Sequence, residues 1–300
     1  MSKMTLKGRI IKGIGGFYYV DAAGVLYETR ARGLFRKNKV TPLVGDMAEI
    51  EVISSDDRTA YLIDIEDRKN SLMRPAVANV DQVLVIFACA NPPANTGLLD
   101  RFLINMEKQE MEVTIVLSKT DLMSDAPELL KNLKDIYESA GYRVIGLSNK
   151  TGEGLDEIRS VMNGKYTVLS GPSGVGKSSL LNSLVPGYDA ATGDISKKLG
   201  KGKNTTRHTE IIEAPFGEDT YIIDTPGYSQ VELLVDDEQD IRLFMREFED
   251  KNTLCRFAGC VHIAEPDCEI KKSVEAKEIS EARYLSYVNI YNETKSRRKW

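Results

Sequence analysis

The stretch Gly171-Pro172-Ser173-Gly174-Val175-Gly176-Lys177-Ser178 determines the fold expected for the middle of the chain. It matches the pattern G-x-x-x-x-G-K-[ST], which is typical of loops that bind nucleotide phosphates. Residues 166–169 predict a strand before it, and residues 177–184 predict a helix after it. Backbone N–H groups of this phosphate loop and of the helix N-terminus would then surround the phosphates. A chance glycine turn is the alternative interpretation.

Side chains at the end of the phosphate loop have separate roles at such a site. Lys177 would reach the β- and γ-phosphates, and Ser178 would bind Mg²⁺. The next residue, Ser179, is also expected to belong to the nucleotide site. Downstream, residues 199–207 form a loop rich in glycine, lysine and threonine. A hydroxyl such as that of Thr205 can close onto Mg²⁺ and the γ-phosphate, as in nucleotide-dependent switches. The alternative is a mobile surface loop without this role.

A second phosphate-side motif is Asp224-Thr225-Pro226-Gly227, which ends the strand predicted for residues 221–223. The carboxylate of Asp224 would support the metal ion, and the N–H of Gly227 would face the γ-phosphate. Alone, these residues are an ordinary signal for a strand that ends in a turn. Their position downstream of a phosphate loop favours the functional interpretation.

Two stretches predict recognition of the base. Leu117-Ser118-Lys119-Thr120-Asp121 ends a predicted buried strand and resembles the Asn-Lys-x-Asp guanine motif of GTPases. Asp121 can accept hydrogen bonds from N1–H and the exocyclic amino group of guanine, a donor pair that adenine lacks, while Lys119 would lie along the base plane. Ser148-Asn149-Lys150-Thr151-Gly152 follows the next strand and resembles the loop that supports the guanine oxygen. Without the phosphate loop, Lys-x-Asp would indicate only an exposed strand end.

The order of these motifs predicts a circular permutation. In an ordinary GTPase the phosphate loop comes first, whereas here residues 118–121 and 148–150 precede residues 171–178 and 224–227. Strands alternate with helices from about residue 70, which predicts an α/β domain with a doubly wound parallel sheet. The site survives permutation because its parts are neighbours in space. The segment after Gly227 then leads directly into the C-terminal part, so nucleotide state can move that part.

The two ends of the chain predict further domains. Residues 1–66 contain short strands broken by glycine turns, which indicates a small β-barrel of the OB or SH3-like type. We therefore expect three parts: an OB-fold RNA-binding domain over 1–66, the permuted GTPase domain over 70–230, and a zinc-binding domain over 231–300. Helical periodicity in residues 238–248 and 274–291 makes the last part mainly helical.

Three cysteines and one histidine lie close together in the C-terminal part. Their spacing predicts a closed, tetrahedral structural zinc site with four protein ligands: Cys255, Cys260, His262 and Cys268. Three thiols cannot all pair as disulfides, and a nucleotide-binding protein of a reducing compartment argues against disulfides in any case. The remaining cysteine, Cys89, lies in an apolar strand and is expected to be a core thiol.

Composition and charge limit the other possibilities. Hydrophobic residues make up 42% of the 300 residues and charged residues 28%, which is typical of a globular protein and argues against disorder. No apolar run is long enough to span a membrane, and residues 1–7 lack a signal region, so we expect a cytoplasmic protein. The net charge is −5, yet the first 45 residues hold nine basic and two acidic residues, and residues 295–300 are basic as well. Basic ends on an acidic body suggest nucleic-acid contacts, with solvated surface charge as the alternative.

Together these features resemble the ribosome small-subunit-dependent GTPase A family (RsgA) over nearly the whole chain. The resemblance includes Arg74-Pro75-Ala76-Val77-Ala78-Asn79-Val80-Asp81-Gln82 at the domain entrance, the permuted motif order and the spacing of the Cys₃His cluster. It implies hydrolysis of GTP to GDP, stimulated by the small ribosomal subunit during its late maturation. It further implies that the barrel and the zinc domain contact ribosomal RNA. We expect a monomer that needs Mg²⁺ with GTP and one zinc ion, and that has no membrane partner.

The chain departs from the family pattern at two sites. Asn204 stands before the paired threonines, where the family usually has a histidine that is thought to help position or activate the attacking water. A Ras-like protein keeps a glutamine at the position that Tyr228 occupies here. Asparagine can orient water but cannot take its proton at neutral pH; His208 is a possible substitute, although packing or surface exposure explains it as well. The second departure is Ser118, which replaces an asparagine that normally contacts the base and ties the loops together. We expect the shorter hydroxyl to lose one of these hydrogen bonds, which would weaken nucleotide binding by about 1 kcal/mol.

Two other functions remain as alternatives at this point. In the first, the protein is an RNA-binding placeholder for which GTP is an affinity switch and hydrolysis is vestigial. In the second, it is a P-loop ATPase or a small-molecule kinase, which predicts preference for ATP. The pair Lys119 and Asp121 argues against the second.

The departure at position 204 generates a prediction. We expect Asn204→His to raise the hydrolysis rate stimulated by small subunits about 10²-fold, because a general base typically contributes at least that factor. Phosphate release measured for both proteins under identical conditions checks it. Equal rates would contradict the assignment of Asn204 as the reason for slow turnover.

Overall fold

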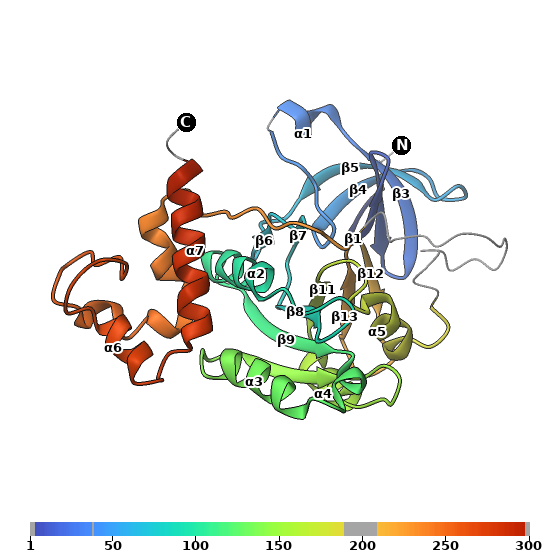
Figure 1. Ribbon diagram of the computed structural model, residues 1–300. Coiled ribbons are helices and arrows are strands. Elements are labelled where there is room, and N and C mark those ends of the chain that lie inside the picture. Colours follow the sequence, from blue (N-terminus) through green and yellow to red (C-terminus); the bar gives the residue numbers. More distant parts are fainter. Residues whose placement is uncertain (1–3, 38, 189–208, 298–300) are drawn as a thin grey trace. The chain divides into compact units, whose positions relative to one another are not determined.

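The structure is a computed structural model that describes residues 4–37, 39–188 and 209–297 (Figure 1). The predicted site residues Asn204 and Thr205 lie outside the described residues. The chain divides into two compact units, each built from three segments. The first comprises Met1–Val83, Ile158–Ser170 and Lys177–Gly227; the second comprises Leu84–Glu157, Gly171–Gly176 and Tyr228–Trp300.

The N-terminal part of the first unit is a closed five-stranded barrel, which confirms the predicted β-barrel. Its strands are β1 (Thr5–Ile14), β2 (Phe17–Ala22), β3 (Val25–Ala31), β4 (Met47–Ser54) and β5 (Thr59–Ile65). β1 pairs antiparallel with both β2 and β4, β2 with β3, and β4 with β5, while β3 and β5 are parallel and close the ring. A short helix, α1 (Gly33–Lys37), follows β3; it was not predicted, nor were the two-residue strands β6 (Ser71–Leu72) and β7 (Val77–Ala78).

Alternating apolar residues form the barrel core because successive side chains of a strand point to opposite faces. Ile10, Val20, Ile50 and Leu62 are fully buried and come from four different strands. The buried carboxylate of Asp46 is satisfied by the guanidinium of Arg68, with distances of 2.7 and 2.9 Å, and by the N–H of Leu43 at 2.7 Å.

The rest of the first unit continues the sheet of the barrel. β11 (Tyr166–Ser170) and β13 (Tyr221–Asp224) are parallel neighbours, and helix α5 (Lys177–Leu184) belongs to the same unit. A strand that was not predicted, β12 (Glu210–Glu213), pairs antiparallel with β13 and also meets β1 at Lys12 and Glu210. The sheet order within this unit is therefore β11-β13-β12-β1-β2-β3-β5-β4.

The second unit begins with an α/β part. Its strands have the order β10 (Arg143–Leu147), β9 (Glu112–Ser118), β8 (Gln82–Ala88), and β9 and β10 are parallel. Every residue of β8 is buried, as predicted for a strand covered on both faces. The helices are α2 (Thr96–Lys108), η1 (Thr120–Met123), α3 (Pro127–Glu138) and α4 (Leu155–Met162), the last of which crosses the boundary of the units.

The C-terminal part of the second unit is helical, but not as the periodicity predicted. Residues 238–248 form two 3₁₀ helices, η2 (Glu238–Phe244) and η3 (Arg246–Phe248), which are separated by the extended backbone of Met245. η4 (Asn252–Leu254), α6 (Glu269–Glu275) and α7 (Glu281–Arg297) follow. The single helix predicted over 274–291 is wrong: Lys277 has φ of 61° and interrupts it, and α7 begins only at Glu281.

A buried arginine joins α7 to the α/β part of the second unit. The side chain of Arg283 is 1% exposed and contacts the carboxylates of Asp100 on α2, at 2.5 Å, and Glu247 on η3, at 2.8 Å. Tyr137 of α3 also donates its hydroxyl to Asp100. The two carboxylates raise the pKa of Arg283 against the opposing effect of burial, so the guanidinium is charged.

This network yields a stability prediction. Replacing Arg283 by methionine (Arg283→Met) leaves two carboxylates buried without their cation, which should lower the unfolding free energy by about 3–5 kcal/mol. Urea denaturation followed by circular dichroism measures the change. Arg256→Met is the matched control, because Arg256 pairs with Asp267 at the surface and should change stability by about 0–1 kcal/mol. Equal effects of the two substitutions would show that the buried network does not hold α7 in place.

Candidate nucleotide site and metal centre

The phosphate loop joins the end of β11 to the start of α5, as its sequence predicted. Gly171 has φ of 151°, and a Cβ atom at this position would lie 2.2 Å from the carbonyl oxygen of Ile86 in β8. Only glycine fits this close approach of two backbones. Val175 is buried, whereas Ser178 and Ser179 are exposed in the first turn of α5.

Lys177 and Asp224 both belong to the first unit. β11 and β13 run parallel with Leu169 opposite Asp224, so both strands end at the same edge of the sheet. The hydroxyl of Thr225 donates to the carbonyl of Leu169 at 2.7 Å and fixes the chain beyond β13. Burial lowers the pKa of Lys177 to about 8, while the charge of Asp224 acts in the opposite direction. A buried ammonium group of this kind would gain much from an anionic phosphate.

The base motif contacts the phosphate loop directly within the second unit. The hydroxyl of Ser118 lies 2.5 Å from the carbonyl oxygen of Val175 and 3.3 Å from that of Phe87. The ammonium group of Lys119 donates to the carbonyls of Gly174, at 2.9 Å, and of Asn91. Serine therefore ties the base motif to the phosphate loop. Whether it has lost a hydrogen bond to the base stays a prediction.

The two predicted base-recognition stretches meet at the ends of β9 and β10. These strands are parallel neighbours, with Ser118 opposite Leu147. Ser148, the next residue, donates its hydroxyl to Asp121 Oδ1 at 2.8 Å. A carboxylate oriented by a neighbouring hydroxyl is suited to reading a pair of N–H donors. The hydroxyl of Thr120 instead lies 3.1 Å from Oε2 of Glu153, a residue that no motif marks.

Asn149 faces the phosphate loop with unsatisfied hydrogen-bonding capacity. Its Nδ2 lies 3.5 Å from where a Cβ atom on Gly176 would be. Its Oδ1 is buried and has no hydrogen-bond partner among the described residues. Buried polar atoms are nearly always paired, so an orphan here fits a site that is completed by a ligand.

The segment after Gly227 is attached to the phosphate loop and to α2. The N–H of Ser173 donates to the carbonyl of Tyr228 at 3.2 Å, and the ring of Tyr228 stacks on Phe102 with centroids 5.8 Å apart. Further on, the Asn105 side chain binds the carbonyl of Glu232 and the N–H of Leu234, each at 2.8 Å. Sequence reasoning missed these α2 residues, because helical spacing marks them only as one face of a helix.

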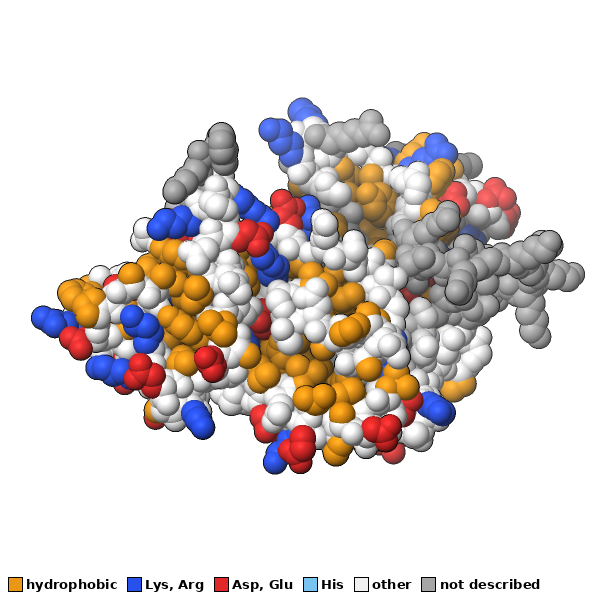
Figure 2. Space-filling view, in the orientation of Figure 1, with side chains coloured by type: hydrophobic (Ala, Val, Ile, Leu, Met, Phe, Trp, Pro, Cys, Tyr) orange, Lys and Arg blue, Asp and Glu red, His pale blue; other side chains and the backbone are white. Residues whose placement is uncertain are grey.

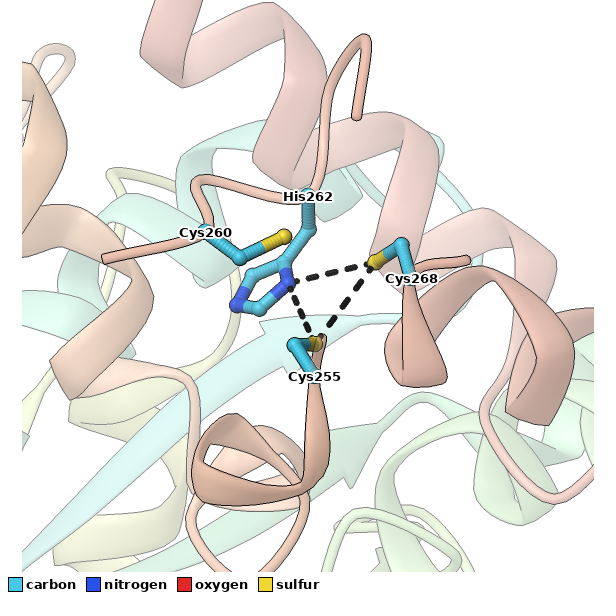
Figure 3. Close-up of side chains that lie close together, drawn as sticks. All are labelled: Cys255, Cys260, His262 and Cys268. Atoms are coloured by element: carbon cyan, nitrogen blue, oxygen red, sulfur yellow. Dashed lines mark hydrogen bonds between the residues drawn. The ribbon is translucent and has the colours of Figure 1, made fainter. Parts of the chain in front are cut away.

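The four predicted metal ligands converge on one point (Figure 3). Their donor atoms all lie within 4.8 Å of one another, and three of the four residues are buried: Cys260, His262 and Cys268. The Nδ1 atom of His262 is 3.3 Å from the sulfur of Cys268 and 3.6 Å from that of Cys255. Cys255 follows η4 and Cys268 precedes α6, so short helices set the two thiols in place.

The surroundings of the cluster fit a zinc ion. His262 Nε2 lies 2.7 Å from Asn252 Oδ1, and an N–H donated there leaves Nδ1 to bind a metal. Burial lowers the pKa of His262 to about 4, so the ring is neutral as a ligand must be. Burial also raises the pKa of the Cys260 and Cys268 thiols. A bound cation would have the opposite effect on these pKa values, so that both thiols would bind it as thiolates. Three thiolates and one imidazole complete the tetrahedral set of a structural zinc site.

Within the described residues, no helix is both apolar and long enough to cross a lipid bilayer.

Comparison with known proteins agrees with this arrangement. The RsgA GTPase model matches residues 65–234, and the RsgA N-terminal domain model matches residues 7–62. A relative named small ribosomal subunit biogenesis GTPase RsgA, from Agathobacter rectalis, is 47% identical over 98% of this chain and 100% of its own length. A relative of the same name from Caldanaerobacter subterraneus subsp. tengcongensis is 40% identical over 98% of this chain and 97% of its own.

Solved structures give the same result. YjeQ from Thermotoga maritima has a TM-score of 0.79 at 32% identity and covers 97% of this chain and 99% of its own. YloQ, described as a circularly permuted GTPase, has a TM-score of 0.76 at 35% identity and covers 98% of this chain and 96% of its own. These matches confirm the predicted permutation and the predicted resemblance. The chain belongs to the RsgA GTPase family.

Proposed function

We propose that this protein hydrolyses GTP and that it does so in the biogenesis of the small ribosomal subunit. The observation that carries the proposal is the direct contact between the base motif and the phosphate loop, made by Ser118 to Val175 and by Lys119 to Gly174. A nucleotide that bridges these two motifs needs them side by side. Membership of the RsgA GTPase family and the names of its relatives supply the biological role.

The proposed roles of the site residues follow from their chemistry. The loop from Gly171 to Gly176 presents backbone N–H groups to the phosphates, and Lys177 neutralises charge at the β- and γ-phosphates. Ser178 and Ser179 lie in the first turn of α5, where they would hold Mg²⁺, and the carboxylate of Asp224 would support the metal ion. When bound, Mg²⁺ offsets the charge that develops on the phosphate oxygens. Gly227 would offer its N–H to the γ-phosphate.

Selection of guanine would depend on the two base-recognition stretches, residues 118–121 and 148–150. Asp121, oriented by Ser148, would accept from N1–H and the amino group of guanine. Lys119, whose ammonium group contacts the carbonyls of Gly174 and Asn91, would lie along the base plane. Thr120 contacts Glu153, and Asn149 offers its amide next to Gly176. Asn204 and Thr205 lie outside the described residues, and their roles at the attacking water and the γ-phosphate are part of the proposal.

The remaining assignments concern the whole molecule. We infer an OB-fold domain over 1–66, a GTPase domain over 70–230 and a zinc domain over 231–300, acting in the cytoplasm as a monomer without a membrane partner. Contacts with ribosomal RNA would be made by the barrel and the zinc domain. The basic residues in the first 45 positions and at 295–300 support this.

One experiment tests the proposed function. Phosphate release from GTP and from ATP is measured with and without purified small ribosomal subunits. We expect hydrolysis of GTP alone, and stimulation by the subunits. Hydrolysis of ATP at the same rate, or no effect of the subunits, would contradict the proposal.

A second candidate function is a nucleotide-switched RNA-binding placeholder with vestigial hydrolysis, which Asn204 favours. Single-turnover measurements with small subunits separate the two, because a placeholder would release phosphate far more slowly than it dissociates from the subunit.

Base selection gives a specific prediction. Asp121→Asn should weaken GTP binding by about 1.5–3 kcal/mol, because the asparagine amide cannot accept both guanine donors as a carboxylate does, and should shift preference toward xanthosine nucleotides. Fluorescence competition with both nucleotides measures it. Asp125→Asn is the matched control, since Asp125 is exposed and lies four residues away. Unchanged GTP affinity in Asp121→Asn would remove Asp121 from the site.

The metal centre gives another prediction. The purified protein should contain one zinc ion per chain, and Cys260→Ala should contain almost none and should unfold at a lower temperature, because binding of a structural zinc ion contributes about 10–16 kcal/mol to folding of such a site. Elemental analysis and thermal unfolding measure both effects. Cys89→Ala keeps the four ligands and is the control. Full zinc content in Cys260→Ala would refute the ligand set.

A further inference from the structure

Arg242 of η2 carries a positive charge that no described carboxylate balances. Its side chain is half-buried, and its Nε atom is enclosed by protein without a hydrogen-bond partner among the described residues. Its guanidinium forms no ion pair within the described ranges either. Removing a cation from water without a partner is costly. A guanidinium in this position therefore indicates a negative group nearby.

Other cations of the C-terminal part have acidic neighbours. Arg246 pairs with Glu107 at 2.7 Å, and Lys251 pairs with Glu278 at 2.6 Å. Figure 2 shows basic side chains beside acidic ones on the visible face of this part. Arg242 departs from this pattern of paired charges.

The metal centre is adjacent to Arg242. Arg242 and the metal ligand Cys255 both line one cavity of about 670 Å³. Asn252 contacts both sides, because its Nδ2 donates to the carbonyl of Arg242 at 3.3 Å and its Oδ1 lies 2.7 Å from His262 Nε2. Burial lowers the pKa of His262 most, and the charge of Arg242 is the next largest cause. The guanidinium is therefore within electrostatic reach of this ligand.

An occupied metal centre would supply the missing negative charge. Three thiolates and one Zn²⁺ leave one negative charge in excess. The N–H of Glu269 already donates to the sulfur of Cys255 at 3.3 Å, but a backbone N–H carries no net charge. The carboxylate of Glu265, which also acts on His262, is occupied by three backbone N–H groups of the loop before it.

We propose that Arg242 is the counter-cation of the zinc centre. Its positive charge offsets the excess negative charge of the thiolates, which strengthens zinc binding and makes the sulfur of Cys255 less nucleophilic. Groups around the ligands of a metal ion tune its binding in this way. Reactivity matters most at Cys255, because this ligand is partly exposed and lines the cavity, whereas the other three are buried. The proposal depends on the zinc ligand set and is independent of GTP hydrolysis.

Competition for zinc on the full chain tests the proposal. The zinc-loaded protein is titrated with a chromogenic chelator of known affinity. We expect Arg242→Gln to weaken zinc binding about 10- to 100-fold, and Arg242→Lys to remain close to the wild type because it keeps the charge. Arg256→Gln is the matched control: Arg256 follows Cys255 directly but pairs with Asp267 at the surface, at 2.9 Å, so its loss should have no effect.

Alkylation of the zinc-loaded protein by iodoacetamide gives a second readout. Mass spectrometry of the peptides measures the rate at each cysteine. We expect Cys255 to react faster in Arg242→Gln than in the wild type or in Arg242→Lys, because a thiolate beside a cation is less nucleophilic. Circular dichroism and basal GTP hydrolysis, measured with zinc in excess, should be unchanged in all variants and verify that they are folded.

Other outcomes overturn the proposal in distinguishable ways. Equal zinc affinity in the wild type and Arg242→Gln shows that the charge does not act on the centre. If Arg242→Lys loses as much affinity as Arg242→Gln, the guanidinium acts through packing and not through charge. If Arg242→Gln keeps its zinc but binds small subunits more weakly, Arg242 contacts a partner instead. A wild-type chain without zinc overturns this proposal together with the ligand set.

Discussion

The hydrogen bond from Ser118 to the carbonyl of Val175 is the contact on which the proposed nucleotide site depends. It joins the end of β9 to a loop 57 residues further along the chain, and Lys119 adds a second bond to Gly174. These bonds leave the loop's N–H groups available, because they use its carbonyl oxygens. In a circularly permuted chain, base and phosphate motifs can meet in this way only if the strand ends are neighbours, and the parallel pairing of β9 and β10 aligns Asp121 and Ser148 at the same edge.

The C-terminal part is bound to the α/β part of the second unit by buried polar contacts as well as by apolar packing. Arg283 reaches two carboxylates, and Asn105 holds both a carbonyl and an N–H of the connecting segment. Buried charges are tolerated only when they are paired with good geometry. These contacts therefore fix the position of α7 relative to the α/β part of the second unit. Since Tyr228 also bonds to Ser173, the same segment touches the phosphate loop at one end and leads to the metal centre at the other.

Much of this arrangement was predictable because the signals are local. The phosphate loop, the base motifs and the four zinc ligands are defined by spacing within 5 to 14 residues, and alternation of apolar residues indicated the barrel. β12 escaped prediction because four residues carry too little periodicity. The buried role of Arg283 was invisible since its partner Asp100 is 183 residues away, and α7 is polar enough to resemble a surface helix. Met245 and Lys277 broke the predicted helices through backbone conformations that no side-chain pattern encodes.

The position of β12 has a consequence for the independence of the barrel. One edge of this short strand faces β13, and the other meets barrel strand β1, where the ammonium group of Lys12 lies 3.3 Å from Glu210. Deleting the barrel would turn β12 into a bare sheet edge, with backbone groups open to pairing with other chains. The N-terminal barrel thus also shields the adjoining sheet from self-association, and a shortened chain lacking it would be prone to aggregate.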